Sequence, residues 1–225
     1  MTRTLSQALG FGLGGVAILL SLGIWQLQRL DWKEGLIARL EAKLSADPVP
    51  LPADPTEAED EYRRVAVSGR FLEGELHLLT SIRPFGPGFR VIAPFETEDG
   101  RRILVDRGYV PETAKDAPRS PGAAEVVGAL VWPDDAGWFT PEPDRAANMW
   151  FARTPGPMAE ALGTEPILLV AETRAGEARF PAPQPATATL RNHHLQYALT
   201  WFSLAAIWTG MTLYLLRRIR RRGAI

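Results

Sequence analysis

Two long apolar segments frame the chain. Residues 4–28 and residues 192–216 each run for 25 residues without a formally charged side chain. About 20 predominantly apolar residues are enough for a helix to cross the hydrocarbon core of a bilayer. Helices buried in soluble domains seldom run this far without a charge. The pattern therefore predicts two transmembrane helices, at residues 4–28 and 192–216.

The first segment has the features of a membrane anchor rather than those of a cleaved signal peptide. Its apolar part is longer than the usual core of a signal peptide. Its far end, GIWQLQRLDWK, is bulky and lacks a small-residue cleavage site. We therefore expect this segment to remain in the membrane as a helix.

Small residues predict how the two helices pack. The first segment has a G-x-x-x-G step at Gly10 and Gly14, and the second has a strip formed by Ala198, Ala205 and Thr209. Small side chains let two membrane helices approach closely. These two faces would permit close packing of an antiparallel pair, and the alternative is that small residues are simply common in membrane helices.

Between the apolar segments the pattern changes to short runs. Residues 31–45 have apolar positions at helical spacing and predict an amphipathic extension of the first helix. A proline-rich, acidic linker follows at residues 47–61, and residues 156–163 predict one brief helix. Asp99-Gly100 predicts a hairpin turn between two alternating runs. The predicted strands are residues 62–71, 75–82, 89–96, 101–110, 125–132, 148–153 and 166–172.

These elements predict an α+β membrane protein. Two antiparallel transmembrane helices would flank a mainly antiparallel β domain outside the membrane, at residues 29–190. The β domain would be an open sheet or a partly closed barrel.

Charge predicts the orientation of this arrangement. The formal net charge of −1 gives no reason to expect a nucleic-acid partner, but the basic residues are unevenly placed. Residues 217–225 carry five arginines directly after the second apolar segment. Lys and Arg gather on the cytoplasmic side of membrane helices. We therefore expect both termini in the cytoplasm and the central domain on the opposite side.

Catalytic motifs are missing from the sequence. It has no GxSxG, Walker loop, dinucleotide-binding fingerprint or HExxH, and it has no cysteine. His77 alternates with apolar neighbours in a predicted strand, a pattern typical of a structural histidine. We therefore expect that the protein is not an enzyme.

Two adjacent histidines, His193 and His194, stand at the start of the second apolar segment. On a helix, the face below His194 holds Tyr197, Trp201 and two alanines, a surface on which a flat apolar molecule could lie. His193 is rotated away by about 100°. A neutral imidazole above an aromatic surface suits axial haem ligation. The spacing alone favours interfacial packing and helix capping over haem ligation.

Five separated segments resemble the Surfeit-locus-one family, whose members are assembly factors of haem-copper cytochrome c oxidase. They are GIWQLQRLDWK, EYRRVAVSGRF, GRRILVDRGYVP, GWFTPEPDRAANMWFA and RNHHLQYALTWF. The family's anchor motif G-x-W-Q-x-x-R is present at Gly23, Trp25, Gln26 and Arg29. Tyr109 replaces the family's usual tryptophan in its G-W-V-P motif.

The resemblance implies a factor of the bacterial inner (cytoplasmic) membrane with a periplasmic central domain. Its cargo would be haem a, and its partners oxidase subunit I, haem A synthase and the lipid bilayer. The family's ligand histidine belongs to an H-L-Q-Y motif, which places the haem iron on His194, with His193 as a neighbour or substitute ligand.

Other residues at the same membrane boundary extend this hypothesis. Tyr197 and Trp201 would flank the macrocycle, and Arg29 or Arg191 would pair with its propionates. Two other functions remain open. One is a haem-independent scaffold that stabilises nascent subunit I, and the other, a weaker alternative, is an enzyme of haem modification.

Overall fold

The computed structural model describes residues 2–119, 121–173, 179–187 and 192–222. The chain forms two compact units. One contains the helical residues before Leu40 and those after Ala188, and the other spans Leu40–Ala188. We call them the helix pair and the β unit.

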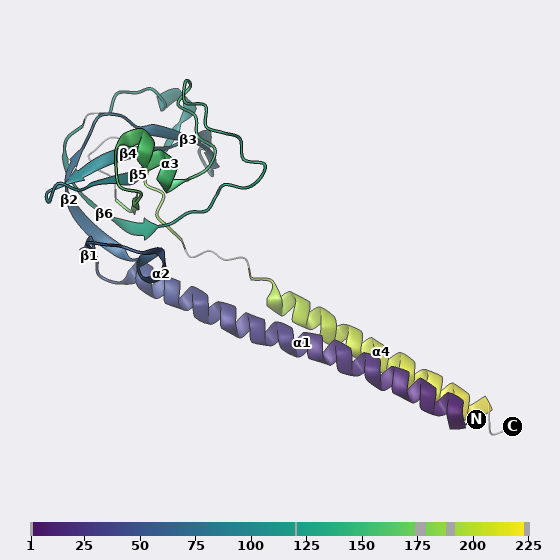
Figure 1. Cartoon of the computed structure of the whole chain (residues 1–225). Helices are drawn as coiled ribbons and strands as arrows, with labels where there is room; N and C mark the ends of the chain where they lie inside the picture. The colour runs from purple at the N-terminus through teal and green to yellow at the C-terminus, as the bar shows by residue number, and fades with distance from the viewer. Residues whose placement is uncertain (1, 120, 174–178, 188–191, 223–225) are drawn as a thin grey trace. The chain divides into compact units, whose positions relative to one another are not determined.

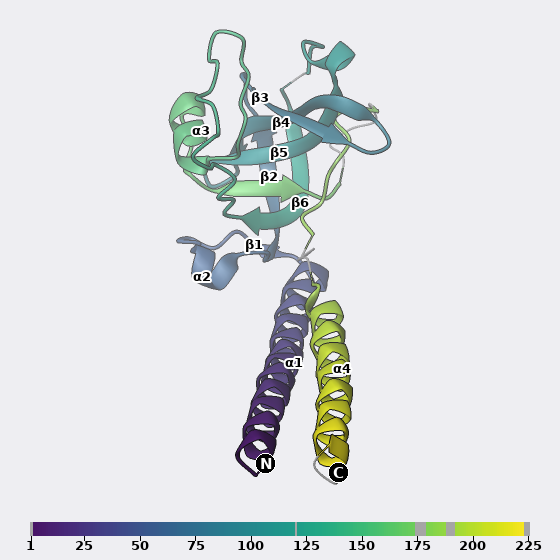
Figure 2. The same ribbon diagram turned by 90° about the vertical axis from the view of Figure 1, so that its right-hand side faces the viewer.

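The helix pair is formed by α1 (Thr2–Ser45) and α4 (His194–Arg222), which run side by side in opposite directions (Figures 1 and 2). Both are long and apolar enough to cross a membrane, and only 11% and 6% of their most apolar stretches are buried. The core helix of a soluble protein would be mostly buried. The helices therefore expose apolar surface that a bilayer would cover. The predicted fold class, two apolar helices flanking a mainly antiparallel sheet, is confirmed.

Three glycines of α1 carry the contact with α4. A Cβ added at Gly12, Gly15 or Gly23 would collide with Thr212, Trp208 or Phe202, respectively. The indole N–H of Trp208 also donates a hydrogen bond of 3.1 Å to the carbonyl oxygen of Gly12. On α4, Ala198 and Ala205 are buried, as the small-residue strip predicts.

The predicted G-x-x-x-G face of α1 is wrong. A Cβ at Gly10 or Gly14 would meet no described atom within 4 Å outside its own helix, and Thr209 of α4 is exposed. Spacing alone shows which residues share a face, but several small-residue faces coexist on one helix. The one used is chosen by the side chains of the partner helix.

Gly15→Leu is expected to widen the helix pair by about 1–2 Å, because interaxial distances vary between about 8 and 10 Å with the size of the contact side chains. Gly14→Leu is the matched control and should leave the spacing unchanged. The measurement is the distance between spin labels on cysteines introduced at exposed Ile18 and Met211, since the natural chain has no cysteine. Equal widening by both variants would contradict the assigned interface.

The β unit is built on one seven-stranded sheet with the order β1-β2-β6-β7-β5-β4-β3. β2 also pairs with β4, from Gly69↔Thr97 to Phe71↔Phe95. The strands β2, β6, β7, β5 and β4 therefore close into a ring. Of the two predicted alternatives, an open sheet or a partly closed barrel, the structure has the barrel. The strands are β1 (Val49–Pro50), β2 (Arg64–Phe71), β3 (Leu76–Ile82), β4 (Gly86–Thr97), β5 (Arg102–Pro111), β6 (Ala123–Val131) and β7 (Leu168–Ala171). The short helices are α2 (Glu57–Asp60), η1 (Glu112–Ala114) and α3 (Pro155–Leu162).

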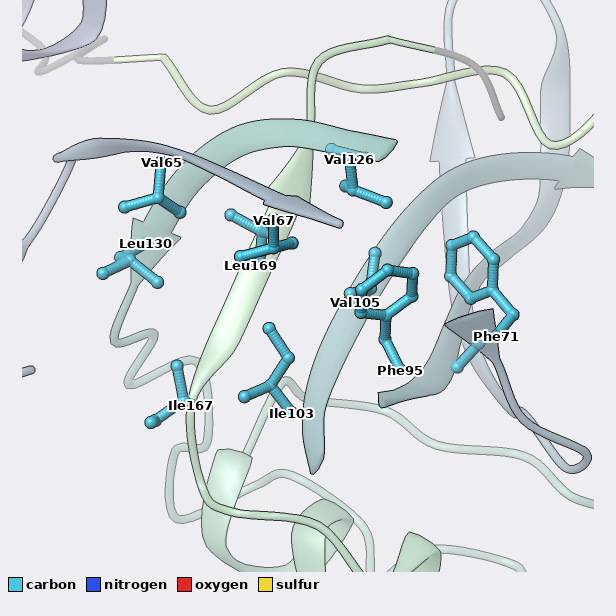
Figure 3. Packing of buried hydrophobic residues seen from close by; sticks show 12 residues of the cluster. Val65, Val67, Phe71, Phe95, Ile103, Val105, Val126, Leu130, Ile167 and Leu169 are labelled. Atoms are coloured by element: carbon cyan, nitrogen blue, oxygen red, sulfur yellow. The ribbon is translucent and has the colours of Figure 1, made fainter. Parts of the chain in front are cut away.

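Alternating apolar residues of the ring strands fill the interior of the barrel (Figure 3). Successive side chains of a strand point to opposite faces, so every second residue faces inward. A second cluster lies on the outer face of the sheet. There Trp150, from the loop after β6, and Met158, from α3, pack against the sheet. The inner cluster consists of Val65, Val67, Phe71, Ala93, Phe95, Ile103, Val105, Val126, Leu130, Ile167, Leu169 and Ala171.

Most predicted elements of the β unit are confirmed. The hairpin at Asp99-Gly100 joins β4 to β5, with Gly100 at a φ of 84°. The predicted linker at residues 47–61 has more regular structure than expected. It contains α2, and its β1 pairs in parallel with β2. Residues 148–153 form no strand. Trp150 makes only an isolated bridge to Leu78, and its indole is buried.

Candidate functional site

Asn192, His193 and His194 form the start of α4. The side chain of Asn192 accepts a hydrogen bond of 3.4 Å from the backbone N–H of His194. The carbonyl oxygen of His193 accepts the first helical bond, 3.2 Å, from Tyr197. Asn192 therefore supplies the side-chain cap. Neither histidine side chain is needed for that role.

The side chains of the two histidines differ in their surroundings. His193 precedes the helix and is exposed, and its ring makes no hydrogen bond to another described residue. His194 is half-buried, and its Nδ1 lies 2.7 Å from Oε1 of Gln26 on α1. The two side chains thus have different surroundings, and His193 lies before the helix rather than on it, so the helical geometry applies to His194 alone.

The bond to Gln26 determines the chemistry of the His194 ring. An amide oxygen can only accept, so in this contact Nδ1 carries the hydrogen and its N–H donates a hydrogen bond to Oε1 of Gln26. Nε2 then keeps its lone pair. Metal-binding histidines are held in the same way, with one ring nitrogen donating to a protein acceptor and the other free to coordinate. His194 is therefore oriented as a potential axial ligand.

Gln26 is a buried polar residue whose contact with His194 the sequence did not predict. It is only 9% exposed, whereas the neighbouring polar residues Gln28 and Arg29 are exposed. A polar side chain within a membrane helix is costly unless it has a partner, and such residues are frequently functional. Its place in the anchor motif was visible in the sequence. Its pairing with His194, 168 residues away, was not.

The face of α4 below His194 is partly covered by α1. Ala198 and Ala205 are 1% and 4% exposed, because the glycines of α1 pack against this side. Tyr197 is 56% exposed, and Trp201 is half-buried. The part of this face that remains accessible is thus narrower than predicted, because α1 covers the alanines. Tyr197 and Trp201 lie at the edge of the covered part.

Of the two arginines predicted to pair with the haem propionates, the structure describes only Arg29. Arg29 follows Gln26 by one helical turn and is exposed, with its guanidinium 4.6 Å from the ring centre of Trp32. It is held by a cation–π contact of modest strength. Arg191 lies outside the described residues.

His77 belongs to a separate polar cluster in the β unit. It is 4% exposed, its Nε2 lies 2.7 Å from Glu75, and Asn148 lies 3.4 Å from its Nδ1. Both ring nitrogens thus have partners in the protein. The interpretation of His77 as a structural histidine agrees with these contacts.

Two apolar helices, one before and one after the β unit in the sequence, indicate a membrane protein. Its sequence matches the SURF1 family over residues 13–206, and the chain belongs to this family. The resemblance drawn from the five motifs is thereby confirmed. Membership of this family indicates involvement in cytochrome c oxidase assembly.

Individual relatives match over most of their length. The chain is 36% identical to Surfeit locus protein 1 of Xenopus tropicalis over 212 residues, which cover 84% of this chain and 69% of the relative. It is 36% identical to Surfeit locus protein 1 of Homo sapiens, covering 82% and 69%. It is 35% identical to a SURF1-like protein of Monosiga brevicollis, covering 91% and 85%.

Proposed function

We propose that the protein carries haem a on His194 and assists its insertion into subunit I of cytochrome c oxidase. The observation that supports this most is the 2.7 Å contact between Nδ1 of His194 and Oε1 of Gln26. It favours the tautomer in which Nε2 is free to bind iron, and it holds the ring without using that nitrogen. The protein is a non-enzymatic carrier in this proposal.

The residues around His194 fit a large apolar macrocycle that must later be released. Haem a is cargo rather than a resident group, so a closed site with two strong ligands would hinder its transfer. One histidine, with Tyr197 and Trp201 at the margin, leaves one side of the site open. Arg29 is exposed one helical turn beyond Gln26 and would pair with a propionate.

The same contacts also favour a second function. The Gln26–His194 bond joins α1 to α4, which is what a haem-independent scaffold for nascent subunit I would need. Haem modification is a third and weaker candidate. The chain would supply one iron ligand and no redox centre of its own.

We propose the inner (cytoplasmic) membrane of a bacterium as the location, with both termini in the cytoplasm and the β unit in the periplasm. The five arginines of residues 217–225 support this orientation. In this place the protein would meet subunit I and haem A synthase within the bilayer. A C-terminal reporter that is active only outside the cytoplasm would overturn the orientation.

The function is tested by purifying the protein after co-expression with the enzymes of haem a synthesis. The carrier proposal expects the absorption spectrum of haem a in the purified wild type. A wild type without haem would favour the scaffold. Conversion of one haem into another would favour the enzyme.

Gln26→Leu is expected to weaken haem a binding about 10- to 100-fold, the usual effect of removing the hydrogen-bond partner of a metal ligand. Without Gln26, the His194 ring can rotate and adopt either tautomer. The measurement is a titration of haem a into detergent-solubilised protein, followed by its absorption bands.

Gln28→Leu is the matched control, because Gln28 lies on the same helix but is exposed. It should bind haem a like the wild type and give the same band positions. Gln26 would have no positioning role if both variants bound haem a with the wild-type affinity and spectrum.

A further inference from the structure

A second polar site lies entirely within the β unit. A pocket of about 410 Å³ opens between the start of β3, the middle of β5 and the segment that follows η1. Its charged lining consists of Glu73, Glu75, Arg107, Lys115, Asp116 and Arg119, together with His77. None of these residues takes part in the proposed haem site.

Arg107 reaches this pocket from a β-bulge. The register of β5 against β4 moves from Val91↔Gly108 to Ile92↔Asp106, which leaves Arg107 as the extra residue. Gly108 has a φ of 105°, and a Cβ there would collide with the backbone of Ala182. Bulges redirect a side chain relative to the regular strand. Here the bulge supplies a guanidinium to the pocket.

The other charges that lie deep in the pocket are already engaged. Arg119 lies 2.8 Å from a carboxylate oxygen of Glu75 and also donates to the carbonyl oxygens of Lys115, Ala114 and Ala117. Glu75 also binds His77. Burial alone would raise the pKa of Glu75, but the bonds from His77 and Arg119 outweigh it and hold that pKa below its ordinary value. This network leaves little capacity for a ligand.

Arg107 differs from its neighbours because its guanidinium makes no hydrogen bond or ion pair with any residue in the described part of the chain. Its contact is with the ring of Phe71, 4.2 Å from the guanidinium carbon. Burial lowers the pKa of Arg107, and Glu75 offsets this only in part. A partly buried charge without hydrogen-bond partners costs free energy that a ligand could recover.

We propose that this pocket binds a monoanionic oxygen pair, a carboxylate or a phosphodiester, with Arg107 as the residue that holds it. The planar guanidinium presents two parallel N–H donors, which match either group in a bidentate arrangement. Glu73 and Asp116 stand exposed at the rim. Together with Glu75 they would repel a dianion, so a single negative charge is preferred.

The first test is protection of Arg107 from phenylglyoxal in the full-length protein in a neutral detergent. The probes are butyrate and dimethyl phosphate, and the reaction at each arginine is followed by peptide mass spectrometry. A probe at about twice its dissociation constant should slow the modification of Arg107 about three-fold by mass action. Whichever probe protects at the lower concentration identifies the source of the oxygen pair.

Arg102 provides the internal control, since it lies on the same strand and is paired with Glu96 at the surface. Its modification should not respond to either probe. Equal protection of both arginines, protection by chloride at the same ionic strength, or no protection of Arg107 would overturn the proposal.

A second measurement separates binding from folding. Butyrate or dimethyl phosphate should raise the Tm of the wild type and of Arg102→Gln but not that of Arg107→Gln, because a ligand stabilises only the fold that binds it. Arg107→Lys keeps the positive charge but loses the two parallel N–H donors of the guanidinium, so the ligand should raise its Tm by less than that of the wild type. An unchanged rise in Arg107→Gln would also overturn the proposal. Both measurements are made without haem, so they are independent of the proposed function.

Discussion

Replacing His194 by alanine is expected to remove haem a from the purified protein. The loss should exceed the roughly 10- to 100-fold expected for Gln26→Leu, because the ligand itself disappears rather than its hydrogen-bond partner. The amide of Gln26, only 9% exposed, would also lose its bond to the ring. The measurement is the ratio of haem a to protein after co-expression with haem a synthesis.

His193→Ala is the matched control. It removes the same side chain from the preceding residue, where the imidazole is exposed and bonded to no other described residue. We expect haem a to be retained at the wild-type ratio. Retention by both single variants would refute His194 as the ligand, and loss in His193→Ala alone would transfer that role to His193.

Replacing Asp106 by alanine is expected to destabilise the β unit by about 3–5 kcal/mol, the typical cost of leaving a buried charge without its partner. Asp106 is 0% exposed and lies 2.6 Å from Nε of Arg90. Its other oxygen accepts a bond of 2.9 Å from the backbone N–H of Gly108. Alanine would leave Arg90 without its carboxylate partner, with only its bond to the carbonyl oxygen of Gln184, and it would leave the bulge at Arg107 without its acceptor.

The measurement for Asp106→Ala is the free energy of unfolding from denaturant curves followed by tryptophan fluorescence. Glu96→Ala on the neighbouring strand is the control. It removes two ion pairs, with Arg70 and Arg102, whose arginine side chains are mostly exposed. Exposed pairs contribute about 0–1 kcal/mol each. A cost for Asp106→Ala no larger than that for Glu96→Ala would show that the buried pair does not hold the bulge.

The predictions that were confirmed depend on local pattern. The absence of charge over residues 4–28 and 192–216 requires long apolar helices wherever they lie in space. Asp99-Gly100 produces its turn because Gly adopts a positive φ without strain.

The predictions that failed needed a partner from elsewhere in the chain. Gly10 and Gly14 have the spacing of a packing face, yet Gly12, Gly15 and Gly23 are the glycines that meet α4. Residues 148–153 alternate like a strand, but they pair with the sheet only through the isolated bridge of Trp150 to Leu78, and the side chain of Trp150 belongs to the outer cluster. Neither outcome is encoded within a window of a few residues.

The sequence by itself determined the two apolar helices and most strands of the β unit. Each of these follows from residue types and spacing along one element. Only the tertiary structure decided which glycines meet α4, that β2 and β4 close the barrel, and that Gln26 holds His194. It also decided that Arg107 enters a pocket without an ionic partner among the described residues. These contacts join residues far apart in the chain, and their energies depend on three-dimensional packing that no local pattern contains.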